Sequence, residues 1–453
     1  MKAALLSLLA LIGAVAHAEP PLPYAYLSPS IGSGPPESNS GSALARDGEW
    51  LAIGAPQYDD YDAVDAGNVA IYHWHDGRWN SLPSLTLRRL ANGITEQAGA
   101  RFGAALALSG NRLLIGCPGC DGSRPKAYLV ELALPLELPP VWYPLHPALI
   151  SAQDDELGIG SAVAISGSTV AVGAPLARSS VEGVERGAVA IGHFDGDAVV
   201  WDDILFGPQS PAGSRFGYSL AMDVTSADSP LAGIRSLLVG APAHVNAGGF
   251  GLAGRAWLYQ RAAFVPGAWN FEQVFANPAN GLADALGASV ALQRRSLDDT
   301  GLVVLGAPGR GIGGRVFVHS RSSFDSAYAF ETELEAVDAA SGDRFGIAVG
   351  VDGGRVLVGA DRRHVDADPD QGAAYLFERL ALPSEVEWLP LQRLEFPGSS
   401  NVNLGHSLAM THSMAVLGAP SGPSERGSAV VYVCDRIFAS GLEAGSGDAC
   451  ALP

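Results

Sequence analysis

A motif that recurs seven times, at intervals of about 60 residues, constrains the fold of this 453-residue chain more than any other feature. Each copy ends an apolar segment with Gly-Ala-Pro or a close variant, and the glycines are spaced 62, 57, 67, 66, 53 and 59 residues apart. These glycines are Gly54, Gly116, Gly173, Gly240, Gly306, Gly359 and Gly418. A regular period indicates one supersecondary unit that is repeated and stacked. The sequence therefore predicts one repeat fold instead of two or three unrelated domains.

The pattern inside each copy predicts four short strands. The second strand is apolar at every position, as in residues 302–305, which is typical of a sheet covered on both faces. The first strand carries small residues, as in residues 103–105, which fit where the units converge near an axis. No helical periodicity occurs within the copies. We therefore predict an all-β fold, a seven-bladed β-propeller of four-stranded antiparallel blades that spans residues 40–433.

A second motif, Phe-Gly or an equivalent pair, precedes most copies of Gly-Ala-Pro. The clearest examples are Phe102-Gly103, Phe216-Gly217, Leu286-Gly287, Phe345-Gly346 and Leu404-Gly405. Phe-Gly followed by Gly-Ala-Pro resembles the FG-GAP repeat of integrin α-subunit head domains and of many secreted bacterial proteins. The resemblance covers nearly the whole chain and implies a seven-bladed propeller. It says little about function, because propellers of this kind serve many roles.

The two ends of the chain differ from the repeats. Residues 1–18 have a lysine, a short apolar run and a small-residue cleavage pattern, which predict a secretory signal peptide. Residues 19–39 form an N-terminal segment in which Tyr24–Leu27 either completes the last blade or belongs to a simple linker. Residues 434–453 form a C-terminal tail. We expect the protein to be exported and to be secreted, periplasmic or at the cell surface.

Four cysteines fit an oxidising compartment. Cys117 and Cys120 have the spacing of a redox motif, but no thioredoxin-like pattern surrounds them. We interpret them as a local structural disulfide, with free thiols as the alternative. Cys434 and Cys450 then pair by elimination and staple the C-terminal tail.

The net charge restricts the partners of the chain. It carries 47 Asp and Glu against 28 Lys and Arg, which gives a formal charge of −19. Such a chain repels phosphate backbones and anionic headgroups, so we expect neither nucleic acid nor a membrane surface as partner. No segment after the leader is apolar for 18 residues, so we expect no membrane insertion. A protein or a glycan is the expected ligand.

Acidic and aromatic residues gather in loops between second and third strands. These loops emerge on one rim of a propeller, which makes them the candidate binding face. The candidates are Tyr58, Asp59, Asp60, Tyr61, Asp62, Asp65 and Phe250. The calcium loop that the family often carries between first and second strands is missing here. Asp366, Asp368 and Asp370 resemble half of a calcium loop, which either binds Ca²⁺ or is a solvated loop tip, so no cofactor is expected apart from that cation.

Catalytic signals are poor. Gly405-His406-Ser407-Leu408-Ala409 resembles the nucleophile turn of serine hydrolases, but Ser219 and Ser289 occupy the same repeat position as Ser407. Two functions stay open: an exported adhesion-type propeller that holds a protein or glycan on one rim, or an extracellular enzyme that degrades a polysaccharide or another polymer in the central channel. The sequence favours the first and predicts that the chain is not an enzyme. Carboxylates facing each other across the axis would favour the second.

Overall fold

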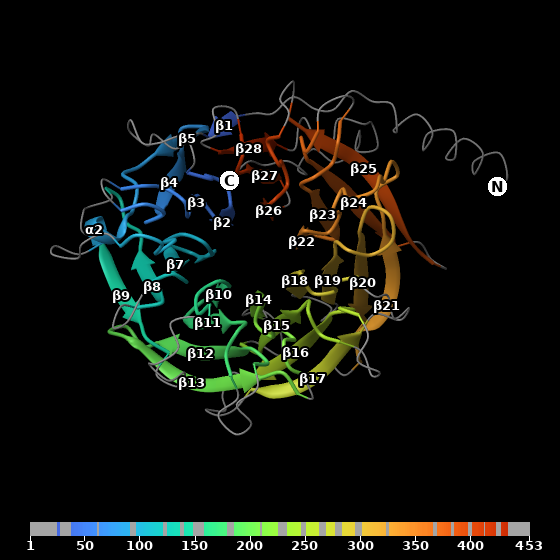
Figure 1. Ribbon diagram of the computed structural model, residues 1–453, viewed down its shortest axis with the longest axis horizontal. Helices are drawn as coiled ribbons and strands as arrows, with labels where there is room; N and C mark the ends of the chain where they lie inside the picture. The colour runs from blue at the N-terminus through green and yellow to red at the C-terminus, as the bar shows by residue number, and fades with distance from the viewer. Residues whose placement is uncertain are drawn as a thin grey trace.

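Seven four-stranded antiparallel sheets stand around a central axis in the computed structural model (Figure 1). The predicted all-β seven-bladed propeller is therefore confirmed. The structure describes residues 25–27, 38–60, 63–90, 97–120, 125–135, 140–147, 158–178, 185–208, 211–224, 233–245, 251–261, 269–276, 283–294, 301–322, 326–365, 369–381, 385–396, 401–411, 413–422 and 427–433. Within these ranges the one α-helix is α2 (Leu87–Leu90).

Six of the sheets are each one sequence repeat, with strands that follow one another from the axis outward, and the seventh adds β1 to the three strands of the last repeat. In chain order the blades are blade 1 (β2 Ala43–Asp47, β3 Trp50–Ala55, β4 Asn68–His75, β5 Arg78–Ser81), blade 2 (β6 Leu106–Ser109, β7 Arg112–Gly116, β8 Ala127–Glu131, β9 Val141–Leu145), blade 3 (β10 Val163–Ser166, β11 Thr169–Ala174, β12 Ala188–Phe194, β13 Val199–Phe206), blade 4 (β14 Ser219–Val224, β15 Arg235–Ala241, β16 Arg255–Arg261, β17 Asn270–Ala276), blade 5 (β18 Ser289–Arg294, β19 Gly301–Ala307, β20 Arg315–Arg321, β21 Ala329–Leu334), blade 6 (β22 Ala348–Asp352, β23 Arg355–Ala360, β24 Ala373–Ala381, β25 Val386–Glu395) and blade 7 (β26 Leu408–Thr411, β27 Met414–Ala419, β28 Ser428–Val433, β1 Ala25–Leu27). Each innermost strand contacts the innermost strands of the blades on either side, so the ring is closed.

Blade 7 takes its outermost strand from the other end of the chain. Strand β1 pairs antiparallel with β28, with Ala25 opposite Val431 and Leu27 opposite Ala429. Leu27 is buried among side chains of blades 1 and 7. Residues 24–27 were predicted either to complete the last blade or to belong to a linker. Strand β1, within this segment, completes the blade and closes the ring.

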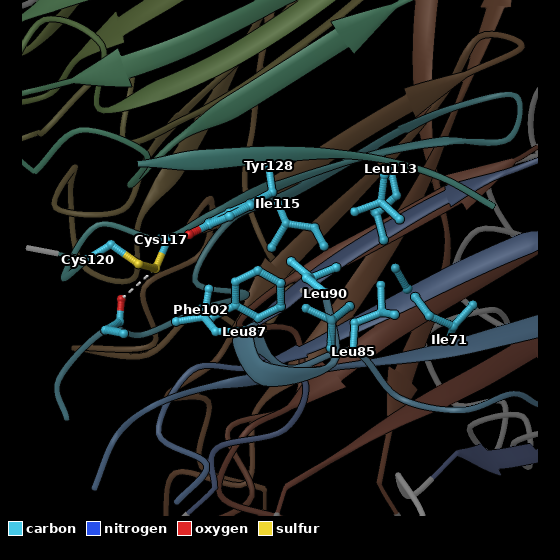
Figure 2. Close-up of a cluster of buried hydrophobic side chains, with 14 of the residues drawn as sticks. Ile71, Leu85, Leu87, Leu90, Phe102, Leu113, Ile115, Cys117, Cys120 and Tyr128 are labelled. Atoms are coloured by element: carbon cyan, nitrogen blue, oxygen red, sulfur yellow. Dashed lines mark hydrogen bonds between the residues drawn. A yellow bond between two sulfur atoms is a disulfide. The ribbon is translucent and has the colours of Figure 1, made fainter. Parts of the chain in front are cut away.

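Burial follows the strand position in every blade. The second strands are almost completely buried, as shown by β19 and β23, because neighbouring blades cover both faces. Figure 2 shows one such layer between blades 1 and 2, where Ile71 and Leu85 pack against Phe102, Leu113 and Tyr128. The outermost strands contain mostly half-buried and exposed residues, as in β17. The core is thus a ring of apolar layers between the blades.

The Gly of each Gly-Ala-Pro packs against the Phe-Gly pair of the next blade. A Cβ atom placed on Gly173 would lie 2.2 Å from the carbonyl oxygen of Gly217. The same approach, between 1.9 and 2.2 Å, recurs at all seven junctions, and at the last one Gly418 meets Gly41 of blade 1. Since real Cβ atoms do not come this close to backbone atoms, only glycine fits. This contact, called here the glycine junction, explains why the two motifs occur together.

The residue before each Phe-Gly glycine anchors the junction. The amide of Phe345 donates to the carbonyl of Gly313 in the preceding blade at 2.7 Å, and its ring is fully buried beside Tyr375 of its own blade. Phe102 and Phe216 are buried in the same way. Burying one such side chain stabilises the fold by about 1.5–3 kcal/mol. The motif therefore joins blades by a backbone hydrogen bond, a close backbone contact and a buried ring.

Substitution of a junction glycine tests this account. We expect Gly173→Ala to lower the free energy of unfolding by about 3 kcal/mol or more, because the added methyl meets backbone atoms that cannot move without separating two blades. Chemical denaturation would measure the loss. The control is Gly110→Ala, at a turn where a Cβ meets nothing within 4 Å and where only the positive φ of 58° adds strain, about 1 kcal/mol. Equal effects of the two substitutions would contradict the junction model.

A buried histidine makes stability depend on pH. His319 lies between the rings of Phe275 and Phe330, and burial lowers its pKa from 6.5 to about 4. As the pH falls below 6.5, the unfolded chain binds a proton at His319 while the folded chain does not, so stability is lost between about pH 6.5 and pH 4. We expect the melting temperature to fall between pH 7 and pH 5, and His319→Phe to reduce that fall. His75→Asn, at an exposed site, should leave the fall unchanged.

Candidate functional site

The seven copies show which residue the fold accepts at each repeat position, so a copy that departs from the others marks a candidate functional residue. Six copies have Pro after Gly-Ala or its variant, whereas the sixth has Asp361. A second position follows the glycine of each Phe-Gly pair and precedes the innermost strand. Its occupants are Ser42, Ala104, Ser161, Tyr218, Ala288, Ile347 and His406, called here the mouth ring. Only one of the seven is ionisable at neutral pH, and that one is His406.

These two departures meet in space. The Nδ1 atom of His406 lies 2.8 Å from Oδ2 of Asp361, across the boundary between blades 7 and 6. Asp361 is 2% exposed, while the side chain of His406 is 38% exposed. A carboxylate only accepts hydrogen bonds, so the neutral imidazole carries its proton on Nδ1. Nε2 then has a free lone pair, and it bonds to no residue within the described ranges.

Asp361 also holds a guanidinium group. Nη1 of Arg344 lies 3.4 Å from Oδ2 of Asp361, the oxygen that His406 contacts. Arg344 has a positive φ of 61° just before Phe345-Gly346, and its side chain is 30% exposed. An imidazole and a guanidinium therefore share one buried carboxylate on the face of the ring where the Phe-Gly pairs lie, called here the Phe-Gly face.

Hydrogen bonds made by the side chains of Asn403 and Asp343 fix the segments that carry these groups. The side-chain amide of Asn403, three residues before His406, donates to the carbonyl of Asp361 at 3.1 Å. Asp343, next to Arg344, is buried and accepts hydrogen bonds from the amide of Ala340 and from Arg363. Because Arg363 lies two residues after Asp361, it ties the two loops together. The site is thus built on rigid junctions of blades 6 and 7.

A second carboxylate supports the same loops. Burial alone would raise the pKa of Asp338, but the hydroxyl of Tyr375 and the guanidinium groups of Arg363 and Arg393 hold that pKa below its ordinary value. The Tyr375 hydroxyl donates to Asp338 at 2.9 Å, and Arg363 donates at 3.1 Å. Asp338 therefore stays ionised and keeps Arg363 in place. Its contribution to the site is positional.

The serine that resembled a nucleophile belongs to the scaffold. The hydroxyl of Ser407 donates to the carbonyl of Gly41 in blade 1 at 2.6 Å. Ser219 and Ser289 make the same bond to the next blade at 2.8 Å. The three hydroxyl groups strengthen glycine junctions, so His406 has no serine partner of its own here.

The innermost strands carry no pair of carboxylates facing each other halfway along the axis, within the part of the chain that the structure describes. Their carboxylates, Asp47, Asp223 and Asp352, lie at the strand ends away from the Phe-Gly face. Asp47 accepts the amide of Gly110, and Asp352 accepts the side chain of Gln293, so both connect neighbouring blades. The strands themselves present mostly Leu, Met, Val and Ala. Within the described residues, the axis is thus not lined by the facing carboxylates that would favour a polymer-degrading enzyme.

Two acidic residues of the predicted binding face make hydrogen bonds within the protein. Asp60 is 6% exposed and accepts two hydrogen bonds from Arg88 of α2, at 3.1 and 3.2 Å. Asp59 accepts the amide of Asp65 at 2.8 Å, which shapes the loop from within. Asp60 cannot face a ligand, so its place in the predicted binding face is corrected. The prediction was based on negative charge in a loop. In the structure the carboxylate of Asp60 is buried and forms an ion pair with Arg88.

The remaining predicted residues are only partly placed. The amide of Tyr58 donates to Ala55 at the base of its loop, and Asp370 has a positive φ and pairs with His364 at 3.5 Å. Tyr61, Asp62, Phe250, Asp366, Asp368, Cys434 and Cys450 lie outside the described residues. Cys117 and Cys120 are joined by a disulfide. Within the described ranges no three His, Cys, Asp or Glu side chains gather as a metal site, and no helix is long and apolar enough to cross a bilayer.

Exposed apolar residues on the Phe-Gly face were missed by the sequence analysis. Tyr218 of the mouth ring is 42% exposed and Ile312 is 70% exposed. The others in loops of this face are Val64, Leu176, Leu252 and Val337. Four of these six lie between blades 3 and 5. Repeat alignment could have found Tyr218, because the equivalent residues are mostly small.

The family follows from the repeats and from one match. Residues 328–377, which run from the end of blade 5 into blade 6, match the FG-GAP repeat family. All seven blades carry the glycine junction that joins the two halves of that motif. The chain is an FG-GAP repeat seven-bladed propeller. No curated protein matches this FG-GAP propeller.

Solved structures similar to the FG-GAP propeller include two lactone-related proteins. One is a candidate 6-phosphogluconolactonase from Bacteroides fragilis, with 10% identity and a TM-score of 0.48, covering 78% of this chain and 84% of that chain. The other is the periplasmic gluconolactonase of Pseudomonas aeruginosa, with 13% identity and a TM-score of 0.45, covering 80% and 86%. Similarity at this level assigns no reaction to the FG-GAP propeller. Both proteins are described as lactonases, and the prediction that this chain is not an enzyme is not carried forward.

Proposed function

We propose that this FG-GAP propeller is an exported hydrolase that cleaves an ester-type bond at the mouth of its central axis, with His406 as general base. The observation that carries the proposal is the pair formed by His406 and the buried Asp361. Both residues depart from the repeat, and neither is needed by the six other junctions. A structural role alone would not require a half-exposed imidazole there.

The geometry favours attack by water on an acyl carbon. Glycosidic bonds are usually cleaved by two carboxyl groups on opposite sides of the bond. The described carboxylates of the innermost strands lie at the far ends of the strands, and Asp47 and Asp352 are engaged between blades. A single imidazole oriented by a carboxylate suits acyl hydrolysis, where one base activates the nucleophile. Of the bonds that an extracellular polymer-degrading enzyme could cleave, the geometry therefore favours ester-type bonds over glycosidic bonds.

Each group then has a defined task. Nε2 of His406 takes a proton from water, and the water oxygen forms a bond to the carbonyl carbon. Asp361 keeps the Nδ1 proton in place and stabilises the imidazolium that results. Arg344, which shares that carboxylate, supplies positive charge for the oxyanion. When the bond to the leaving oxygen breaks, His406 returns the proton to it, which yields a carboxylic acid and an alcohol.

The surroundings suit a substrate outside the cell. The predicted signal peptide and the expected oxidising compartment both support export. The overall negative charge of the chain disfavours strongly anionic substrates. The loops of the Phe-Gly face, where a protein or glycan ligand was expected, would hold the molecule that carries the ester.

Ester hydrolysis by the purified mature chain tests the proposal. We expect wild-type protein to hydrolyse p-nitrophenyl esters, and His406→Asn to lower kcat/KM by about 10²–10⁴, the usual contribution of a general base. Asparagine keeps a donor for Asp361, so the fold should persist, and a melting curve would verify this. Asp361→Asn should lower activity less, because the imidazole stays but loses its orientation.

The control is His75→Asn, which removes an exposed histidine outside the mouth ring and should leave activity unchanged. Activity that survives His406→Asn in a folded protein would remove the proposed base. Absence of hydrolysis by wild-type protein across a panel of esters and lactones would overturn the proposed reaction.

A further inference from the structure

The mouth ring contains three large residues among small ones. Tyr218 precedes β14, Ile347 precedes β22 and His406 precedes β26. The other four positions hold Ser or Ala. Since four blades fold with a small residue here, the fold does not require an aromatic ring at 218 or a branched chain at 347.

Tyr218 stands across the axis from His406. Blades 4 and 7 lie on opposite sides of the ring, as the positions of β14 and β26 in Figure 1 show. Both residues occupy the same repeat position, so each lies at the Phe-Gly end of its innermost strand. Tyr218 is 42% exposed although it has no charge, which leaves an aromatic surface facing solvent at the mouth. Ile347 lies in the blade next to His406.

The innermost strands that follow Tyr218 and His406, β14 and β26, continue the apolar surface. Ser219-Leu220-Ala221-Met222 in blade 4 and Ser407-Leu408-Ala409-Met410 in blade 7 have the same sequence. The Leu and Met side chains of both stretches are half-buried, in contrast to the fully buried second strands. The loops of blades 3 to 5 add the exposed Leu176, Leu252 and Ile312 on the same face. Apolar groups therefore extend from the mouth ring both inward and outward.

We infer that Tyr218 and Ile347 are specificity-determining residues that hold the apolar acyl group of the substrate while His406 acts on its ester bond. This inference rests on the proposed hydrolytic function of His406. The substrate class is thus a neutral ester with an extended apolar acyl chain, and not a polysaccharide ester with a short acetyl group. Burial of the chain against an aromatic and an aliphatic side chain supplies the binding energy.

Chain-length preference measures this role directly. We expect wild-type protein to hydrolyse p-nitrophenyl octanoate with a higher kcat/KM than p-nitrophenyl acetate. Tyr218→Ser and Ile347→Ala introduce residues that other blades already use at this position, so they should fold. Each should lower the octanoate-to-acetate ratio of kcat/KM by roughly tenfold, mainly through a higher KM for octanoate. Tyr218→Phe should keep the wild-type ratio.

The control is Leu134→Ser, which removes an exposed apolar side chain from a loop on the opposite face. Ester hydrolysis without chain-length preference, or a ratio unchanged by Tyr218→Ser, would overturn the inference and leave the proposed function standing. If no ester is hydrolysed, calorimetric titration with 2-decanone, a ketone that cannot be cleaved, separates failure of the proposed hydrolysis from failure of the inferred apolar site. Binding that Tyr218→Ser weakens would support the apolar site without hydrolysis, and absence of binding would overturn it.

Discussion

The close contact between a glycine and the backbone of the next blade is the constraint on which the rest of this structure depends. At Gly173 and its six equivalents, the next blade's carbonyl oxygen occupies the place of a Cβ atom. Blades can then converge near the axis while their second strands stay buried on both faces. The contact also fixes the residue that follows each Phe-Gly pair at the mouth of the axis. The mouth ring, and with it His406, is a product of the way the blades are joined.

The repeat made the fold predictable from the sequence, and the same repeat concealed the site. Each junction position occurs in all seven repeats, so a substitution in one copy does not hide the motif that the other copies share. The pair Asp361 and His406 occurs once, and its members are 45 positions apart in different blades. Considered alone, Asp361 replaces the proline of one Gly-Ala-Pro motif, and His406 is a polar residue in a turn. Their meeting depends on the ring geometry, which places the end of each second strand beside the start of the next blade.

Charge in the sequence did not show which acidic residues are buried. Asp60 looked like a ligand-facing residue in an acidic loop, yet its carboxylate is buried against Arg88. Asp338 and Asp343 likewise hold arginines in place behind the candidate site. A buried carboxylate needs a partner to remain charged, and the chain provides one from a neighbouring element. Composition counts such groups as surface charge, whereas the fold uses them to connect loops.

The pairing of β1 with β28 sets the order in which the ring can be completed. Leu27 pairs with Ala429, which is synthesised about 400 residues later. Until then blade 7 has an open edge, and blades 1 and 7 cannot seal their shared apolar layer, which includes Leu27 and Val431. Ring closure therefore requires β28, and a protein interrupted before this strand has no closed ring. The contact between β1 and β28 thus forms only after all seven blades have been made.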